Sequence, residues 1–201
     1  MVTDLLAEPA PDGWVRTMCP DEPMAGWLGR AIVMENVSAR QDGVALDLPV
    51  GSHYRIDKEI KNVVTVTATT THYWSEHMPR EQRRSIRDLL TVMEVEQPLL
   101  RPTFRASGEE AIDDRAARTG FAERIAASGL TVSPRRYPGW QAVECTGVRE
   151  AVWRMRLLVA ANVLARREEQ TTFVPVDLVR DPDGRITADL VCRAAAFLAT
   201  Y

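Results

Sequence analysis

The run at positions 72–77, which reads HYWSEH, gathers the side chains of this chain that are best suited to chemistry. Histidine exchanges a proton close to neutral pH, and a neighbouring carboxylate can orient it or pair with its charge. We expect His72 to act as a general base or acid, with Tyr73 or Glu76 as an auxiliary group. The alternative is a structural histidine bonded to a backbone carbonyl, with Trp74 packed over it.

The same run does not match the spacing of a zinc-binding motif. HExxH and HxxEH place two histidines on one face of a helix. In HYWSEH the second histidine comes one residue later, and the first falls within a predicted strand. Only a bend at the end of that strand would bring His72, Glu76 and His77 around an ion, so no metal ligand is predicted. Neither GxGxxG nor GxxxxGKS/T occurs, so no cofactor is expected.

An arginine stripe follows directly, at helical spacing. Its members are Arg80, Arg83, Arg84 and Arg87. Guanidinium groups on the first turns of a helix repel one another and oppose the helix dipole, at a cost of a few tenths of a kcal/mol per pair, roughly. Such a stripe is physically reasonable where it binds a phosphate, a carboxylate or an acidic partner. The alternative is a solvated face that is partly neutralised by Glu76, Glu81 and Asp88.

Two further residues are expected to contact a substrate. Trp74 stands between the histidines and the arginine stripe. Asn162 lies in an otherwise apolar predicted helix, where a buried amide must find hydrogen-bond partners. It therefore either faces a ligand or braces a neighbouring stretch of backbone.

The element expected to position His72 is a long strand over 62–74. Residues on one face alternate with threonines on the other, a pattern with a period of two. The alternation places His72 on the apolar face of that strand. Pro79 then opens the amphipathic helix that carries the arginine stripe.

The remaining elements follow from periodicity and turn residues. We predict strands over 31–39 and 44–48, a helix from Ser107 that is kinked or divided near Gly120 and ends at Gly129, a hairpin over 130–146, a core helix over 148–167, a strand over 171–180 and a helix from about Ala188. The order βββ-αα-ββ-α-β-α indicates an α+β fold, with about six strands in a largely antiparallel sheet and helices packed on one face.

Length and composition indicate one domain over residues 1–201, with residues 1–30 as a proline-rich N-terminal arm. The formal charge of −3 argues against a nucleic-acid partner. No apolar run is long enough to span a membrane, and the acidic N-terminus does not resemble a signal peptide. We therefore expect a soluble, cytoplasmic protein. Its three cysteines lie far apart without a CxxC pair, which does not indicate a disulfide framework.

These patterns favour a small-molecule enzyme that acts on an anionic or acyl substrate. General acid–base chemistry would take place in a pocket between the sheet and the core helix. The alternative is a non-catalytic protein-interaction or homo-oligomeric module that uses the threonine-rich strand face or the arginine helix. The sequence leaves open which of the two it is.

Overall fold

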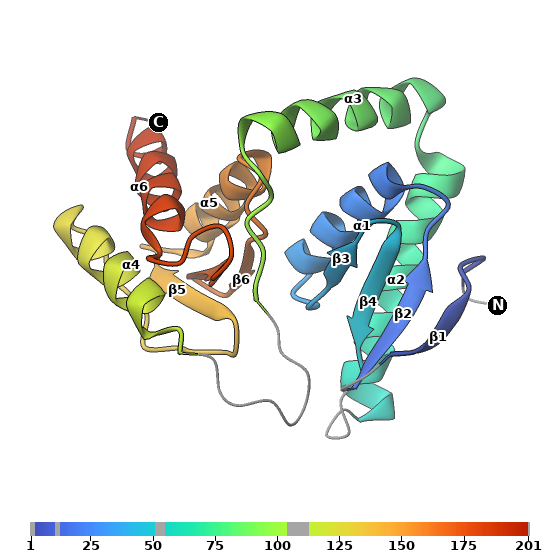
Figure 1. Ribbon diagram of the computed structural model, residues 1–201, viewed down its shortest axis with the longest axis horizontal. Helices are drawn as coiled ribbons and strands as arrows, with labels where there is room; N and C mark the ends of the chain where they lie inside the picture. The colour runs from blue at the N-terminus through green and yellow to red at the C-terminus, as the bar shows by residue number, and fades with distance from the viewer. Residues whose placement is uncertain (1–2, 11–12, 51–54, 104–112, 201) are drawn as a thin grey trace. The chain divides into compact units, whose positions relative to one another are not determined.

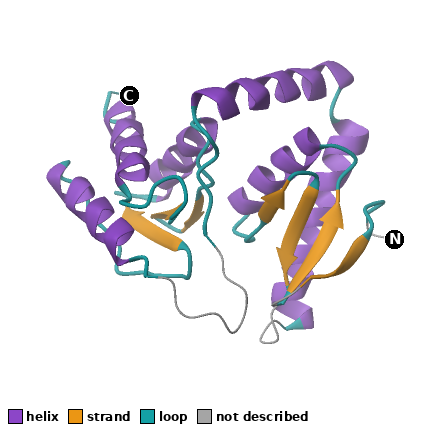
Figure 2. Ribbon diagram, viewed as in Figure 1, coloured by secondary structure: helices purple, strands orange, loops and turns teal. Residues whose placement is uncertain are grey.

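The computed structural model describes residues 3–10, 13–50, 55–103 and 113–200 (Figure 1). The chain divides into two compact units, Met1–Val92 and Met93–Tyr201, and each has its own antiparallel sheet and its own helices (Figure 2). The α+β class and the antiparallel pairing predicted from the sequence are confirmed. The expectation of a single domain over 1–201 stays a prediction.

The first unit contains a four-stranded sheet in the order β1-β2-β4-β3, with every neighbouring pair antiparallel. The strands are β1 (Ala7–Ala10), β2 (Trp14–Met18), β3 (Arg40–Asp42) and β4 (Ala45–Pro49). The hairpin between β3 and β4 turns at Gly43, which has a φ of +56°. The predicted strand over 31–39 is wrong, since residues 31–34 belong to a helix.

That helix is α1 (Glu22–Met34), which packs against β3, β4 and a second helix. Residues 1–30, which were expected to form a proline-rich N-terminal arm, contain β1, β2 and most of α1. Pro23 occupies the first turn of α1, where no intrahelical N–H is lost. The Asp21 side chain accepts a hydrogen bond from the Met24 N–H at 2.8 Å and caps the helix.

The predicted strand over 62–74 is also wrong. These residues form α2 (Lys61–His72), which follows the π-helical turn η1 (Ile56–Ile60) and leads into a second π-helical turn, η2 (Tyr73–His77). The sequence carries a second pattern beneath the alternation, since Val63, Thr67 and Thr71 recur every four residues and form the buried face of α2. Packing of that face, with α1 beside it, outweighs the strand propensity of valine and threonine.

The buried face of α2 contains two threonine hydroxyls, of Thr67 and Thr71, that have no hydrogen-bond partner among the described residues. Thr67→Val keeps the shape of the side chain and removes one such hydroxyl. We expect it to raise the free energy of unfolding by about 1 kcal/mol, measured by urea denaturation. Thr69→Val on the exposed face of α2 is the control and should change stability by less than about 0.5 kcal/mol. A loss of stability in Thr67→Val would mean that its hydroxyl is bonded.

The helix predicted after Pro79 is confirmed as α3 (Arg80–Glu96), and the boundary between the units falls within it. The second unit continues with a three-stranded sheet in the order β5-β7-β6. Its elements are α4 (Arg115–Ala127), β5 (Trp140–Glu144), α5 (Val148–Ala160), β6 (Arg166–Glu168), β7 (Thr171–Pro175) and α6 (Arg185–Leu198). Helix α6 packs against α4 and α5, and α5 packs against β7.

Three predicted elements of the second unit change. Helix α4 continues through Gly120 without a break and ends before Gly129, as expected; the predicted start at Ser107 lies outside the described residues. The core helix ends at Ala160 instead of residue 167, and the last strand ends at Pro175 instead of residue 180. No helix in the described parts of the chain is both long enough and apolar enough to cross a membrane.

Candidate functional site

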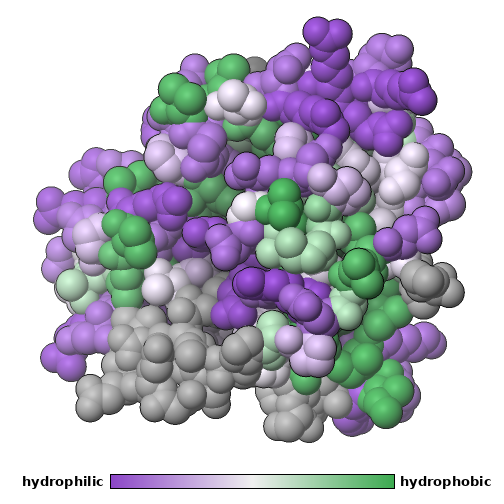
Figure 3. All heavy atoms as spheres, turned by 45° about the vertical axis from the view of Figure 1, so that its right-hand side comes forward, coloured by the Kyte–Doolittle hydropathy of each residue, from purple (hydrophilic) through white to green (hydrophobic). Residues whose placement is uncertain are grey.

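A groove with a volume of about 720 Å³ lies on the first unit beside the first turns of α3. All four members of the arginine stripe line it, together with two residues of η2 and the segment that leads into α1. The lining residues include Arg80, Arg83, Arg84, Arg87, Trp74, Ser75, Asp21 and Asp88. We call this the arginine groove. Figure 3 shows hydrophilic side chains at the top of the view, over α3.

The backbone around Pro79 aims the arginine stripe into the groove. Met78 is extended, with φ of −79° and ψ of 121°, and ends η2. The first turn of α3 closes where the Arg83 N–H donates to the Pro79 carbonyl at 3.0 Å. Trp74 is 4% exposed, and its ring lies 5.3 Å from that of Trp27 in α1. The tryptophan pair therefore fixes one wall of the groove.

The charges in the arginine groove are not balanced. Arg87 forms an ion pair with Asp21, the same residue that caps α1. Among the described residues, no carboxylate pairs with the other three members of the stripe, Arg80, Arg83 and Arg84. Asp88 is the second acidic residue in the lining. Four arginines against two aspartates leave an excess of positive charge, which suits a phosphate or carboxylate group.

The three residues predicted to be catalytic lie close together in sequence but do not line the arginine groove. His72 is exposed at the end of α2, so the prediction that it faces the apolar core is wrong. Tyr73 is 45% exposed and stacks on Trp27 with ring centroids 6.1 Å apart. Glu76 is exposed. Their roles as acid, base and auxiliary group stay predictions.

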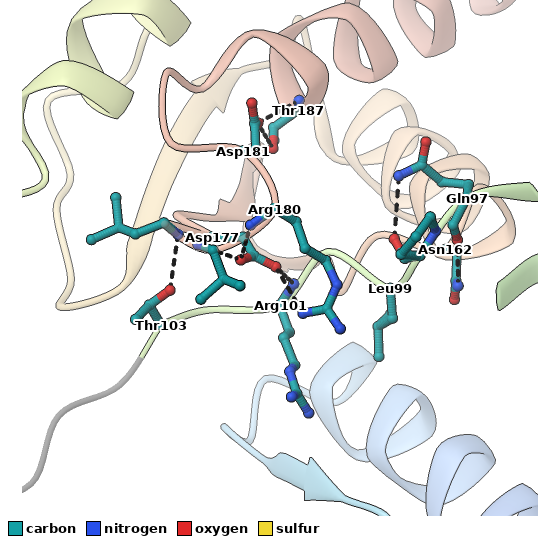
Figure 4. A network of polar contacts seen from close by, with 12 residues as sticks. Gln97, Leu99, Arg101, Thr103, Asn162, Asp177, Arg180, Asp181 and Thr187 are labelled. Atoms are coloured by element: carbon teal, nitrogen blue, oxygen red, sulfur yellow. Dashed lines mark hydrogen bonds and ion pairs between the residues drawn. The ribbon is translucent and has the colours of Figure 1, made fainter. Parts of the chain in front are cut away.

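Asn162 lies in the second unit, just after α5, and is 1% exposed. It adopts a left-handed conformation with φ of +59°, which ends the helix. Its side-chain amide donates to the Gln97 carbonyl at 2.8 Å and to Glu94 Oε2 at 3.2 Å (Figure 4). The backbone carbonyl of Asn162 accepts a hydrogen bond from the Leu100 N–H at 2.9 Å. These contacts brace the backbone after α3, and a role in substrate binding stays a prediction.

Two buried aspartates hold the loop between β7 and α6 and were not predicted from the sequence (Figure 4). Asp177 accepts hydrogen bonds from the Arg101, Val179 and Arg180 N–H groups at 3.0–3.1 Å. Asp181 accepts from the Thr187 N–H at 2.8 Å and from the Thr187 hydroxyl at 2.6 Å. Asp181 therefore satisfies N–H groups in the first turn of α6.

The second unit has a groove of its own, of about 840 Å³, at the start of α5 and the end of α6. Trp153 and Phe197 line it, with Arg149 and Glu150 as its charged residues. One arginine and one glutamate give no excess of charge. The arginine groove therefore has the more distinctive chemistry.

A metal centre with three or more protein ligands and a reactive thiol both find less support in the described structure. No group of three or more histidine, cysteine or acidic side chains is arranged to hold a metal ion within the described residues. Burial, with a smaller contribution from the charge of Asp21, raises the pKa of Cys19 to about 11. Burial also raises the pKa of Cys145. Both thiols are therefore protonated near neutral pH and are poor nucleophiles.

The clearest residue that the sequence did not reveal is Asp21. Its ion pair with Arg87 joins positions 66 residues apart, and only the packing of α1 brings them together. Comparisons with protein-family models, with curated proteins and with solved structures found no match to this chain, so the case for a function rests on the geometry of the arginine groove.

Proposed function

We propose that the first unit binds a small anionic molecule in the arginine groove, through a phosphate or carboxylate group of that molecule. The observation that carries the proposal is the set of three guanidinium groups, of Arg80, Arg83 and Arg84, that share the groove without a carboxylate partner among the described residues. A bound anion would offset their mutual repulsion.

The chemistry of arginine narrows the class of ligand. A guanidinium group donates two parallel hydrogen bonds to a phosphate or carboxylate, so adjacent arginines on one helix face can hold several oxygens at once. The groove lies beside the N-terminal turns of α3, where the helix dipole also favours an anion. Trp74 lines the groove but is 4% exposed, so it supports one wall from within and does not offer its ring face to the ligand.

Binding of the anion is the step common to an enzyme and to a non-catalytic module. In the enzyme form of the proposal, the groove anchors the substrate, and His72, Tyr73 and Glu76 supply acid–base groups. Because His72 is exposed and none of the three lines the groove, the geometry favours the binding step over the chemical step. In the other form, an acidic protein segment occupies the same groove.

The proposal predicts that pyrophosphate and citrate raise the thermal midpoint of the full chain at millimolar concentration, since ligands that bind the folded state stabilise it. Arg83→Gln combined with Arg84→Gln should weaken binding by more than about tenfold, since a hydrogen bond to a charged group contributes about 1.5–3 kcal/mol. Isothermal titration calorimetry measures the affinities. Raising the NaCl concentration should weaken binding of the wild-type protein.

Arg115→Gln is the matched control, because Arg115 also lies in the first turn of a helix and its side chain is 87% exposed. It should leave anion affinity unchanged. A wild-type protein that binds neither anion, or an Arg115→Gln variant that loses as much affinity as the double variant, would rule out the arginine groove as a small-anion site. Circular dichroism of each variant confirms that the fold is intact.

A further inference from the structure

The imidazole rings of His72 and His77 meet on the surface of the first unit. Their Nε2 atoms lie 3.0 Å apart, and the rings are edge to face with centroids separated by 4.7 Å. Both side chains are exposed. Neither lines the arginine groove, so a function of the pair does not depend on the binding of an anion in that groove.

The π-helical turn η2 is what brings these two rings together. Its defining hydrogen bond runs from the Met78 N–H to the Tyr73 carbonyl at 2.8 Å and spans five residues. In an α-helix, side chains three or four positions apart are neighbours. The wider turn of a π-helix instead stacks side chains five positions apart, which is the separation of His72 and His77. Turns of this kind are frequent at functional sites.

We propose that His72 and His77 form a two-histidine chelate for a divalent transition-metal ion such as Zn²⁺, Ni²⁺ or Cu²⁺. A metal–imidazole bond is about 2.0–2.1 Å long. Two such nitrogens on one ion, at angles between square and tetrahedral, are therefore about 2.9–3.4 Å apart. In the structure this separation of 3.0 Å is that of a hydrogen bond between the two rings. It falls within the range for a chelate, so an ion that replaces the shared proton can bind both nitrogens at this separation.

The surroundings of the pair support an ordered but open site. The ring of His77 lies 6.5 Å from that of Tyr73, which in turn stacks on Trp27. These contacts restrict the orientation of the His77 ring. Within the described residues no third ligand joins the pair, so water or a ligand group completes the coordination. Imidazole nitrogens select zinc, nickel and copper over magnesium and calcium.

The chain contains three histidines, which makes imidazole NMR a site-specific test. We expect Zn²⁺, added to the full-length chain, to shift the ring signals of His72 and His77 together and to leave the signal of His53 in place. A trace of Cu²⁺ should broaden the same two signals. Mg²⁺ should have no effect. These measurements need no variant and so do not depend on how a variant folds.

Variants then test whether both rings bind one ion. His72→Ala and His77→Ala should each weaken Zn²⁺ binding by more than about tenfold. Loss of a residue that only supports a metal ligand already weakens binding about tenfold or more, so loss of a ligand should cost at least as much. His53→Ala is the matched control and should bind Zn²⁺ like the wild-type protein. Ring signals of His72 and His77 that ignore millimolar Zn²⁺, or a His72→Ala variant in which His77 still binds with wild-type affinity, would overturn the proposal.

Discussion

Gly184→Ala is expected to destabilise the second unit by at least about 3 kcal/mol. Most single substitutions cost less than this, and larger losses have a specific structural cause such as a steric clash. An added Cβ at this position would stand 2.0 Å from the carbonyl oxygen of Ala117 in α4. The residue also has a φ of +70°, which an alanine adopts only at a further cost of about 1–2 kcal/mol. Urea unfolding measures the total loss in the free energy of unfolding. Faster hydrogen exchange in α4 and α6 would show that the loss is located where these helices meet.

Gly129→Ala separates the two contributions. Gly129 also has a positive φ, of +77°, but no atom lies within 4 Å of its added Cβ. We expect the free energy of unfolding of Gly129→Ala to fall by about 1–2 kcal/mol, the cost of the left-handed conformation alone. If Gly184→Ala lost no more than Gly129→Ala, the close approach of α4 to the turn before α6 would be contradicted.

The close contact between α4 and the turn before α6 also accounts for Gly120, where a helix break was wrongly predicted. A Cβ on Gly120 would stand 2.1 Å from the carbonyl oxygen of Asp183. The glycine is thus required by the turn that packs against α4, and the helix itself does not break there. From the sequence, a glycine inside a helical pattern indicates only a weak point. Its partner is more than 60 positions away, and no local pattern reveals it.

Local periodicity predicted one part of the candidate site well and another badly. The arginine stripe depends only on spacing within α3, so its shared face could be read directly from the sequence. The element before it contained two valid patterns, an alternation and a repeat of Val63, Thr67 and Thr71. Tertiary packing favours the repeat of every four residues and therefore the helix. Local propensity does not include such packing, so the sequence alone did not predict it. His72 consequently moved from an expected core position to the surface.

The contact between His72 and His77 shows a further limit of spacing arguments. The two histidines are five positions apart, which matches neither a strand face nor an α-helical face. Only the extra residue of a π-helical turn aligns them. Such a turn has no sequence signature of its own. The sequence separation of the two histidines argued against a metal site, but the π-helical turn η2 brings their rings into contact.

Glu150→Ala is the second change expected to have a large effect, because it leaves a buried positive charge without its partner. Arg154 in α5 has a side chain that is 1% exposed, and it forms an ion pair with Glu150 one turn earlier. Among the described residues, Arg154 also donates a hydrogen bond to the Glu144 carbonyl at 3.2 Å. Removing one member of a fully buried pair costs about 3–5 kcal/mol. Because the Glu150 side chain is 24% exposed, we expect a cost at the lower end, about 3 kcal/mol. Urea unfolding of the variant tests this value.

A double variant distinguishes an unpaired charge from a simple loss of packing. Glu150→Ala combined with Arg154→Leu removes the carboxylate and the buried charge together. Replacing both members of a buried pair by apolar groups is often close to neutral. We therefore expect the double variant to be more stable than Glu150→Ala alone. A double variant that is less stable would indicate that the arginine side chain acts mainly by packing.

The contribution of Glu150 should also depend on pH. Burial raises the pKa of Glu150, but hydrogen bonds from Thr146 and the charge of Arg154 outweigh that effect and hold the pKa below its ordinary value of 4.5. A carboxylate with a lowered pKa stabilises the fold fully above its unfolded pKa, and the stabilisation is lost as the pH falls through the folded pKa. The stability gap between the wild-type protein and Glu150→Gln should therefore be constant near neutral pH and should narrow below about pH 4.5. A gap that widened in acid would mean that Glu150 is protonated more easily in the folded chain than in the unfolded one.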